Sequence, residues 1–188
     1  MHWRNDPTHY GLVSILLHWL MAALIVGLFA LGKYMVGLDY SHPWYLVAPD
    51  LHRGLGVVLA LLWVSRLIWR LANPRPEILG RPWERRLALW VQRVFYVLIP
   101  ALALSGYLIT TAQGQPLWVF GWGRIPATLY GIAHQEDIAG RVHEWLADGL
   151  IALAGLHALA ALKHHFIDHD SSLRRMLRPG QPPPRSDS

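Results

Sequence analysis

Four long apolar stretches limit what this 188-residue chain can fold into. They run over approximately residues 12–31, 51–71, 87–111 and 141–162. A hydrocarbon core roughly 30 Å thick is spanned by about 20 helical residues, and each stretch is long enough. Backbone polar groups in lipid must be satisfied within the chain, so such a segment spans as an α-helix. The sequence therefore predicts an all-α integral membrane four-helix bundle that occupies residues 1–178.

The composition agrees with a membrane protein rather than a soluble one. Charged residues make up 15% of the chain, whereas soluble domains carry about a quarter. The first apolar stretch is too long for a signal-peptide core and no small-residue cleavage site follows it, so we expect it to be retained. Residues 179–188 are polar and proline-rich, and they are predicted to be a disordered tail.

The positive charges are distributed unequally between the two sides of the predicted bundle. One side holds 13 of the 17 Lys and Arg residues, including those of both termini, and the other side holds four. Because cytoplasmic loops carry the excess of Lys and Arg, both termini are expected to be cytoplasmic. The net charge of +5 is explained by this topology. The arginines do not form one basic face of the kind that binds nucleic acid.

The chain contains no cysteine. This excludes disulfides, thiolate-bound zinc, iron–sulfur clusters and covalently attached c-type haem. A metal or haem would have to be held by histidine, methionine or carboxylates, and the chain has 11 histidines.

Four histidines lie inside or at the rim of the predicted spans, and they sort into two depths. His18 in the first span and His157 in the fourth lie in the cytoplasmic half. His52 in the second span and His143 in the fourth lie near the outer surface. Ionisable residues within a membrane are costly unless they are paired, so they indicate function. The sequence therefore predicts two level pairs, His18 with His157 and His52 with His143.

The spacing of His143 and His157 places both on one side of the fourth helix. Fourteen residues correspond to a rise of about 21 Å and a rotation only about 40° short of four full turns. One helix would therefore contribute a ligand to each of two stacked sites.

A bis-histidine site inside a helical bundle fits haem better than zinc. Zinc takes four protein ligands or three and a water, whereas haem takes two axial imidazoles from facing helices. Room for a ring is predicted beside Gly54, Gly56, Gly149 and Gly155. Two b-type haems at two depths would carry electrons across the membrane, and six-coordinate iron would leave no position for oxygen. A histidine-lined metal transporter stays a remote alternative, although few carboxylates lie in the spans.

Several segments resemble the bacterial cytochrome b561 family, the small four-helix di-haem membrane cytochromes, over about residues 8–178. They are ILLHWLM, LHRGLG, RLIWRLANPRPE and RVHEWLADGLIALAGLHALAALKHHFIDHDSSLRRMLRP. The resemblance implies two b-haems in the bacterial inner membrane and electron exchange with the quinone pool. It also implies oxidation of superoxide at the periplasmic face, with ubiquinone as acceptor. The four paired histidines match the family's axial ligand positions, and His164 matches the position beside the quinone.

Two further interpretations remain open. Arg53, next to His52, is either a partner of haem propionates or an interfacial arginine whose charged end reaches water. The chain is either an oxidoreductase that passes electrons to quinone or the haem-b anchor of a hydrogenase or formate dehydrogenase complex. The expected partners are lipid, quinone and superoxide. If the chain is a haem-b anchor, a larger redox subunit is also expected.

Overall fold

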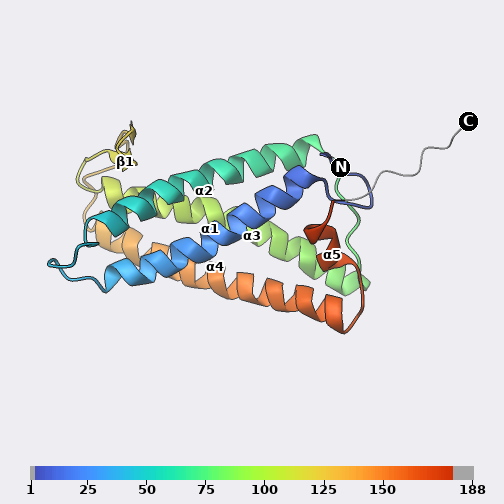
Figure 1. Ribbon diagram of the computed structural model, residues 1–188. Helices are drawn as coiled ribbons and strands as arrows, with labels where there is room; N and C mark the ends of the chain where they lie inside the picture. Colours follow the sequence, from blue (N-terminus) through green and yellow to red (C-terminus); the bar gives the residue numbers. More distant parts are fainter. Residues whose placement is uncertain (1–2, 180–188) are drawn as a thin grey trace, which may run out of the picture.

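The computed structural model describes residues 3–179, which form four long helices, one short helix and a small hairpin (Figure 1). The elements in chain order are α1 (Leu12–Val36), α2 (Val47–Ala72), α3 (Pro82–Thr111), β1 (Leu117–Val119), β2 (Gly123–Ile125), α4 (Gln135–Phe166) and α5 (Ser172–Leu177). All four long helices are long and apolar enough to cross a membrane. The predicted all-α membrane bundle is confirmed, and residues 180–188 of the predicted tail lie outside the described residues.

Each long helix extends past the apolar run that predicted it, and in α3 and α4 the added turns contain polar residues. The α3 helix begins at Pro82, whose fixed φ suits a first helical position, and the backbone N–H of Arg81 donates to Glu84 over 2.7 Å. The α4 helix has Glu136 and Asp137 in its first turn and basic residues in its last, as the helix dipole favours.

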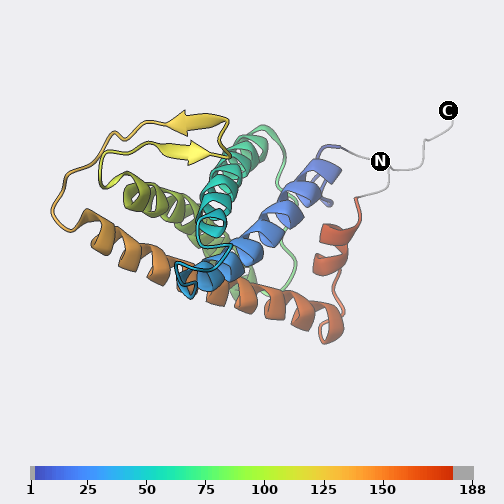
Figure 2. The same ribbon diagram turned by 60° about the vertical axis from the view of Figure 1, so that its left-hand side comes forward.

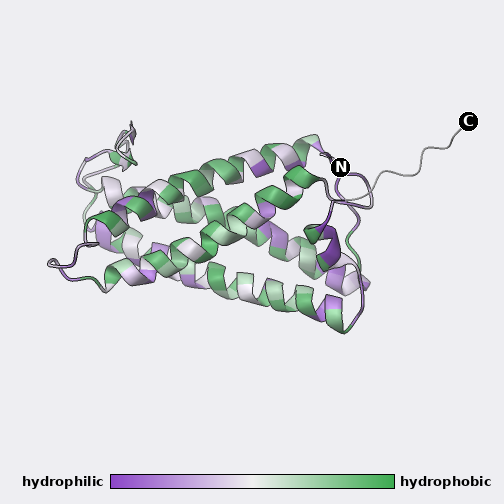
Figure 3. Ribbon diagram, viewed as in Figure 1, coloured by the Kyte–Doolittle hydropathy of each residue, from purple (hydrophilic) through white to green (hydrophobic). Residues whose placement is uncertain are grey.

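The four helices pack around a narrow core in the middle of the bundle. Along the chain, α1 packs on α2, α2 on α3, and α3 on α4, and α4 also meets α1. The core cluster consists of Met21, Leu28, Leu59, Ile99 and Leu150, with at least one residue from each long helix. Many large apolar side chains outside this core are exposed, and apolar residues cover the outer faces of the helices (Figure 3). A surface of this kind is suited to lipid.

The two ends of the bundle differ. At one end, which we call the basic end, the N-terminal segment, the α2–α3 connection and α5 lie together (Figures 1 and 2). There Trp19 donates to the carbonyl of Met176 over 2.7 Å, and Arg175 donates to the carbonyl of Glu77 over 2.9 Å. The other end, the hairpin end, carries the α1–α2 connection and the antiparallel β1–β2 pair.

The hairpin docks one aromatic side chain on α2. A Cβ atom at Gly54 would overlap the ring of Phe120, and Phe120 itself has a φ of 51°. A positive φ is uncommon for a residue with a side chain, so the surrounding contacts must hold this conformation. The expectation that Gly54 leaves room for a cofactor is therefore wrong: its missing side chain admits Phe120 instead.

Candidate functional site

The four histidines of the spans lie in two pairs contributed by three helices. The ring centres of His18 on α1 and His157 on α4 are 6.3 Å apart, with their planes at 75°. The ring centres of His52 on α2 and His143 on α4 are 6.2 Å apart, with their planes at 73°. His18, His52 and His143 are partly buried, and His157 is more exposed. The structure thus brings together the residues that depth in the membrane had paired.

These separations suit one metal ion between two imidazoles. A metal–imidazole bond is about 2 Å long, so two imidazoles on opposite sides of one metal have ring centres about 6 Å apart. Both pairs meet this condition, and in each pair the rings come from different helices. The donor set therefore fits the iron of a b-type haem, which needs no thiolate and no covalent attachment.

The pair at the hairpin end is supported by α1 and α3, neither of which supplies one of its histidines. A Cβ atom at Gly32 would lie 3.3 Å from Cε1 of His52, and one at Gly106 would lie 3.2 Å from Cε1 of His143. Both distances are tighter than ordinary van der Waals contact. A side chain at either glycine would press on an imidazole, so these two positions let the rings reach into the bundle.

Hydrogen bonds from α3 fix the orientation of His143. Its Nδ1 lies 3.1 Å from the carbonyl oxygen of Leu102 and 3.0 Å from Oγ of Ser105. The Ser105 hydroxyl donates to that same carbonyl, and the carbonyl can only accept. The neutral imidazole therefore carries its proton on Nδ1 and has its lone pair on Nε2, which is the state that binds a metal.

The pair at the basic end has a different neighbour. Nη1 of Arg66, on α2, lies 3.3 Å from Nδ1 of His18. A guanidinium can only donate, so in this contact Nδ1 accepts and the ring proton sits on Nε2. His18 would hold iron through Nε2 only with its ring proton on Nδ1, and Arg66 would then have to turn to another partner.

Arg53 lies at the hairpin end and pairs with Asp50, three residues before it on α2. Both residues line an open cavity of about 680 Å³ between α2, the end of α3 and the hairpin, together with Trp118 and Phe120. The carboxylate of Asp50 already compensates the charge of Arg53. Its role toward a haem propionate stays a prediction.

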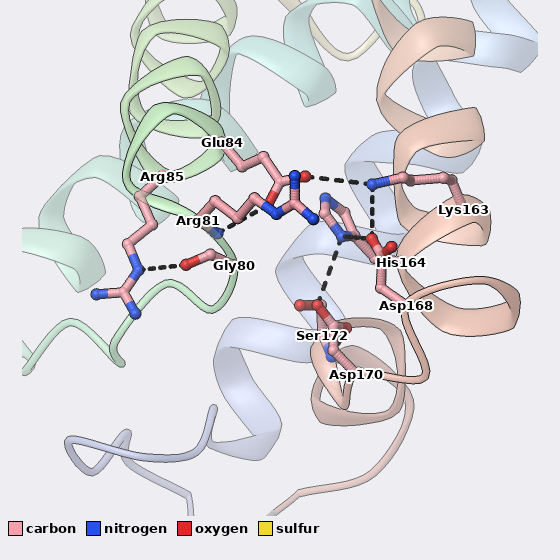
Figure 4. Close-up of polar contacts among 9 residues, drawn as sticks. All are labelled: Gly80, Arg81, Glu84, Arg85, Lys163, His164, Asp168, Asp170 and Ser172. Atoms are coloured by element: carbon pink, nitrogen blue, oxygen red, sulfur yellow. Dashed lines mark hydrogen bonds and ion pairs between the residues drawn. The ribbon is translucent and has the colours of Figure 1, made fainter.

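His164 belongs to a polar network at the basic end (Figure 4). Its Nδ1 lies 2.7 Å from Oδ2 of Asp168 and 3.6 Å from Oδ2 of Asp170. The ammonium group of Lys163 lies 2.7 Å from Asp168 and 3.2 Å from Glu84, which joins α4 to α3. The hydrogen bond and charge of Lys163 hold the pKa of Asp168 below its usual value.

The same network resembles a metal site in its donor atoms alone. Ligand atoms of Glu84, His164 and Asp168 all lie within 4.8 Å of one another. Lys163 already bridges the two carboxylates and supplies the positive charge that a metal ion would bring. We therefore interpret the cluster as an ion-pair network beside a histidine.

Sequence reasoning missed several residues that contact the paired histidines. Arg66 entered the prediction only as one of the 13 Lys and Arg residues of the positive side, but it lies inside α2 at the level of His18. An arginine five residues before the end of an apolar run is a signal that could have found it. Ser105 and Gly106 lie in the one span without histidine and carried no such signal. Asp148, which had no assigned role, pairs with Lys33 over 3.0 Å.

Comparisons with known proteins identify the family of this chain. The family model described as prokaryotic cytochrome b561 matches residues 9–179. The chain is 45% identical over 179 residues to cytochrome b561 homolog 2 of Escherichia coli K12, covering 94% of this chain and 95% of the relative. It is 28% identical over 174 residues to the probable superoxide oxidase CybB of Yersinia pestis, covering 89% and 95%. It is 27% identical over 178 residues to cytochrome b562 of Cereibacter sphaeroides, covering 90% and 96%. The chain therefore belongs to the prokaryotic cytochrome b561 family of membrane electron-transfer proteins, whose cofactor is haem b.

Proposed function

We propose that this protein holds two b-type haems and passes electrons through them to a quinone. The proposal rests on the two histidine pairs, each of which has one member on α4. The ring centres are 6.3 Å apart in the pair His18 and His157, and 6.2 Å apart in the pair His52 and His143. His18 and His157 would hold one iron, and His52 and His143 the other. When bound, the haems supply one-electron redox chemistry, which protein side chains lack.

The chain's own residues set how that chemistry is used. Two imidazoles would hold each iron, so substrates would exchange electrons with the haem edge rather than bind to the metal. Leu102 and Ser105 orient His143, and the glycines at positions 32 and 106 admit the rings. Since α4 carries one ligand of each pair, it fixes the separation of the two sites at about 21 Å of helix rise.

Superoxide is the proposed electron donor and ubiquinone the proposed acceptor. The name of the Yersinia pestis relative supports the first assignment. Oxidation of superoxide to O₂ releases one electron, and reduction of a quinone to quinol takes two electrons and two protons. Two superoxide ions would therefore be consumed for each quinol formed.

We further propose that residues 1–178 form one domain in the bacterial inner membrane, with both termini and the basic end in the cytoplasm. The location of 13 of the 17 Lys and Arg residues supports this orientation. The hairpin end, with the pair His52 and His143, would then face the periplasm. The quinone would be reduced near His164 at the basic end, where protons are drawn from the cytoplasm.

The first test is performed on the purified protein. A reduced-minus-oxidised spectrum with haem quantified per polypeptide is expected to give two low-spin b-haems per chain. Under a steady flux of superoxide, ubiquinone is expected to be reduced with a ratio of two superoxide ions per quinol. Haem without superoxide-driven quinol formation would overturn the choice of donor, and copurification of a large redox subunit would indicate a haem anchor instead.

Arg66 yields a separate prediction about the haem at the basic end. Among the described residues, His18 is the one hydrogen-bond partner of its guanidinium, so iron held by His18 would free Arg66 to pair with a haem propionate. Arg66→Gln is expected to lower the reduction equilibrium constant of one haem about tenfold, or about 59 mV for one electron, because a nearby positive charge favours the reduced haem. Potentiometric titration measures this directly.

The matched control for that titration is Arg70→Gln, one turn further along α2. Arg70 contacts Gln92 and the ring of Tyr96 and touches neither histidine pair. The haem reduction potentials of the Arg70→Gln variant are expected to stay close to those of the unchanged protein. Equal shifts in both variants would mean that Arg66 acts only through the general charge of this end.

A further inference from the structure

A second cavity lies between α2 and α3 near the basic end, and none of the four paired histidines lines it. Its volume is about 360 Å³. Three arginines line it, Arg70 on α2, Arg75 after α2, and Arg93 on α3, together with apolar and aromatic side chains. We call this cavity the α2–α3 groove.

Among the described residues, no carboxylate pairs with the three arginines of the groove. No acidic residue lines the groove among residues 3–179. Arg70 donates to the neutral side-chain oxygen of Gln92 over 3.2 Å and lies 5.0 Å from the ring centre of Tyr96. Arg75 and Arg93 are exposed. Arginine stays protonated in proteins, so the groove presents three positive charges to whatever enters it.

The remainder of the groove is apolar and faces outward. Leu67, Leu71 and Val97 line it, and both Leu71 and Val97 are largely exposed on the helix surfaces that lipid would cover. Trp63 lies at the same groove, and its indole nitrogen is buried without a hydrogen-bond partner among the described residues. A ligand that matches the groove must therefore join an anionic group to a long apolar chain.

We propose that the α2–α3 groove binds an acidic phospholipid from the inner side of the membrane. The phosphate lies among Arg70, Arg75 and Arg93, because a guanidinium binds phosphate oxygens through paired hydrogen bonds. An acyl chain lies along Leu67, Leu71 and Val97. Basic pockets between membrane helices on the cytoplasmic side are suited to anionic head groups. The site depends on neither the haems nor the quinone, and only its place on the inner side rests on the orientation proposed above.

The test compares lipid binding by the purified haem-loaded protein and by the Arg75→Gln/Arg93→Gln double variant. Native mass spectrometry during titration with phosphatidylglycerol, and separately with phosphatidylcholine, counts bound lipids. The unchanged protein is expected to prefer phosphatidylglycerol, and the double variant to lose about tenfold or more of that affinity. The haem spectrum confirms that the variant is folded.

A control variant separates a defined site from general attraction to a basic surface. Arg85→Gln/Arg86→Gln removes the same number of charges from the same end of the bundle, but neither residue lines the groove. This control is expected to bind phosphatidylglycerol as the unchanged protein does. An equal loss in both double variants, or no preference for phosphatidylglycerol in the unchanged protein, would overturn the proposal. Displacement of the lipid by inorganic phosphate alone would show a simple anion site and would also overturn it.

Discussion

Replacement of His143 by alanine is expected to remove one haem and to leave the other bound. His143 is the α4 partner of His52, with ring centres 6.2 Å apart, and alanine offers iron no ligand. The pair formed by His18 and His157 belongs to the other level and keeps both of its imidazoles. The cluster of Met21, Leu28, Leu59, Ile99 and Leu150 holds the bundle without contribution from either pair.

The complete experiment uses all four single alanine variants and compares their haem content and spectra. His52→Ala and His143→Ala are expected to lose the same haem, with about half of the total absorbance. His18→Ala and His157→Ala are expected to lose the other. His134→Ala, at the start of α4 and outside both pairs, is the control and should keep two haems.

The pattern of losses tests the pairing as well as the ligand roles. If His143→Ala and His18→Ala removed the same haem, the two levels would be assigned wrongly. If any single variant lost both haems while staying folded, binding at the two levels would be coupled. Two haems in every variant would show that these imidazoles are not axial ligands.

The fold could be predicted from the sequence because four apolar runs admit few arrangements in lipid. Depth in the membrane also predicted the pairing of His18 with His157 and of His52 with His143. In an antiparallel bundle, the position of a residue along its helix gives its depth. The resemblance to a known family added the quinone and superoxide, which no spacing of residues could supply.

What the sequence could not supply depends on side-chain packing between helices. Gly54 is an example. A glycine near a candidate ligand is consistent with space for a cofactor, and it is equally consistent with space for an aromatic side chain. Phe120, far along the chain in the hairpin, fills that space. Arg66 is another, since its contact with His18 depends on the rotation of α2 relative to α1.

Replacement of His164 is expected to slow quinone reduction about a hundredfold while both haems stay bound. Reduction to quinol consumes two protons, and transfer by a positioned side chain typically contributes 10²–10⁴-fold. Asp168 lies 2.7 Å from Nδ1 of His164. Because Lys163 holds the pKa of Asp168 below its usual value, this carboxylate is ionised at neutral pH. Its negative charge favours the proton on Nδ1, so Nε2 would be the atom that exchanges protons with the proposed quinone.

The measurement is the rate of quinol formation at saturating superoxide, with haem content as the folding control. His164→Ala is expected to show the full loss. Asp168→Asn is expected to show a smaller one, because the ring keeps its place but loses the carboxylate that orients its proton. His165→Ala is the matched control, since His165 packs against Phe166, with ring centres 4.8 Å apart, and lies outside the network. Equal slowing in the His164 and His165 variants would assign the loss to the helix end, and haem loss in His164→Ala would place this residue in haem binding instead.

An unchanged rate of quinol formation in His164→Ala would show that the quinone does not react at the basic-end network. The cavity beside Arg53 would then be the next candidate site for the quinone.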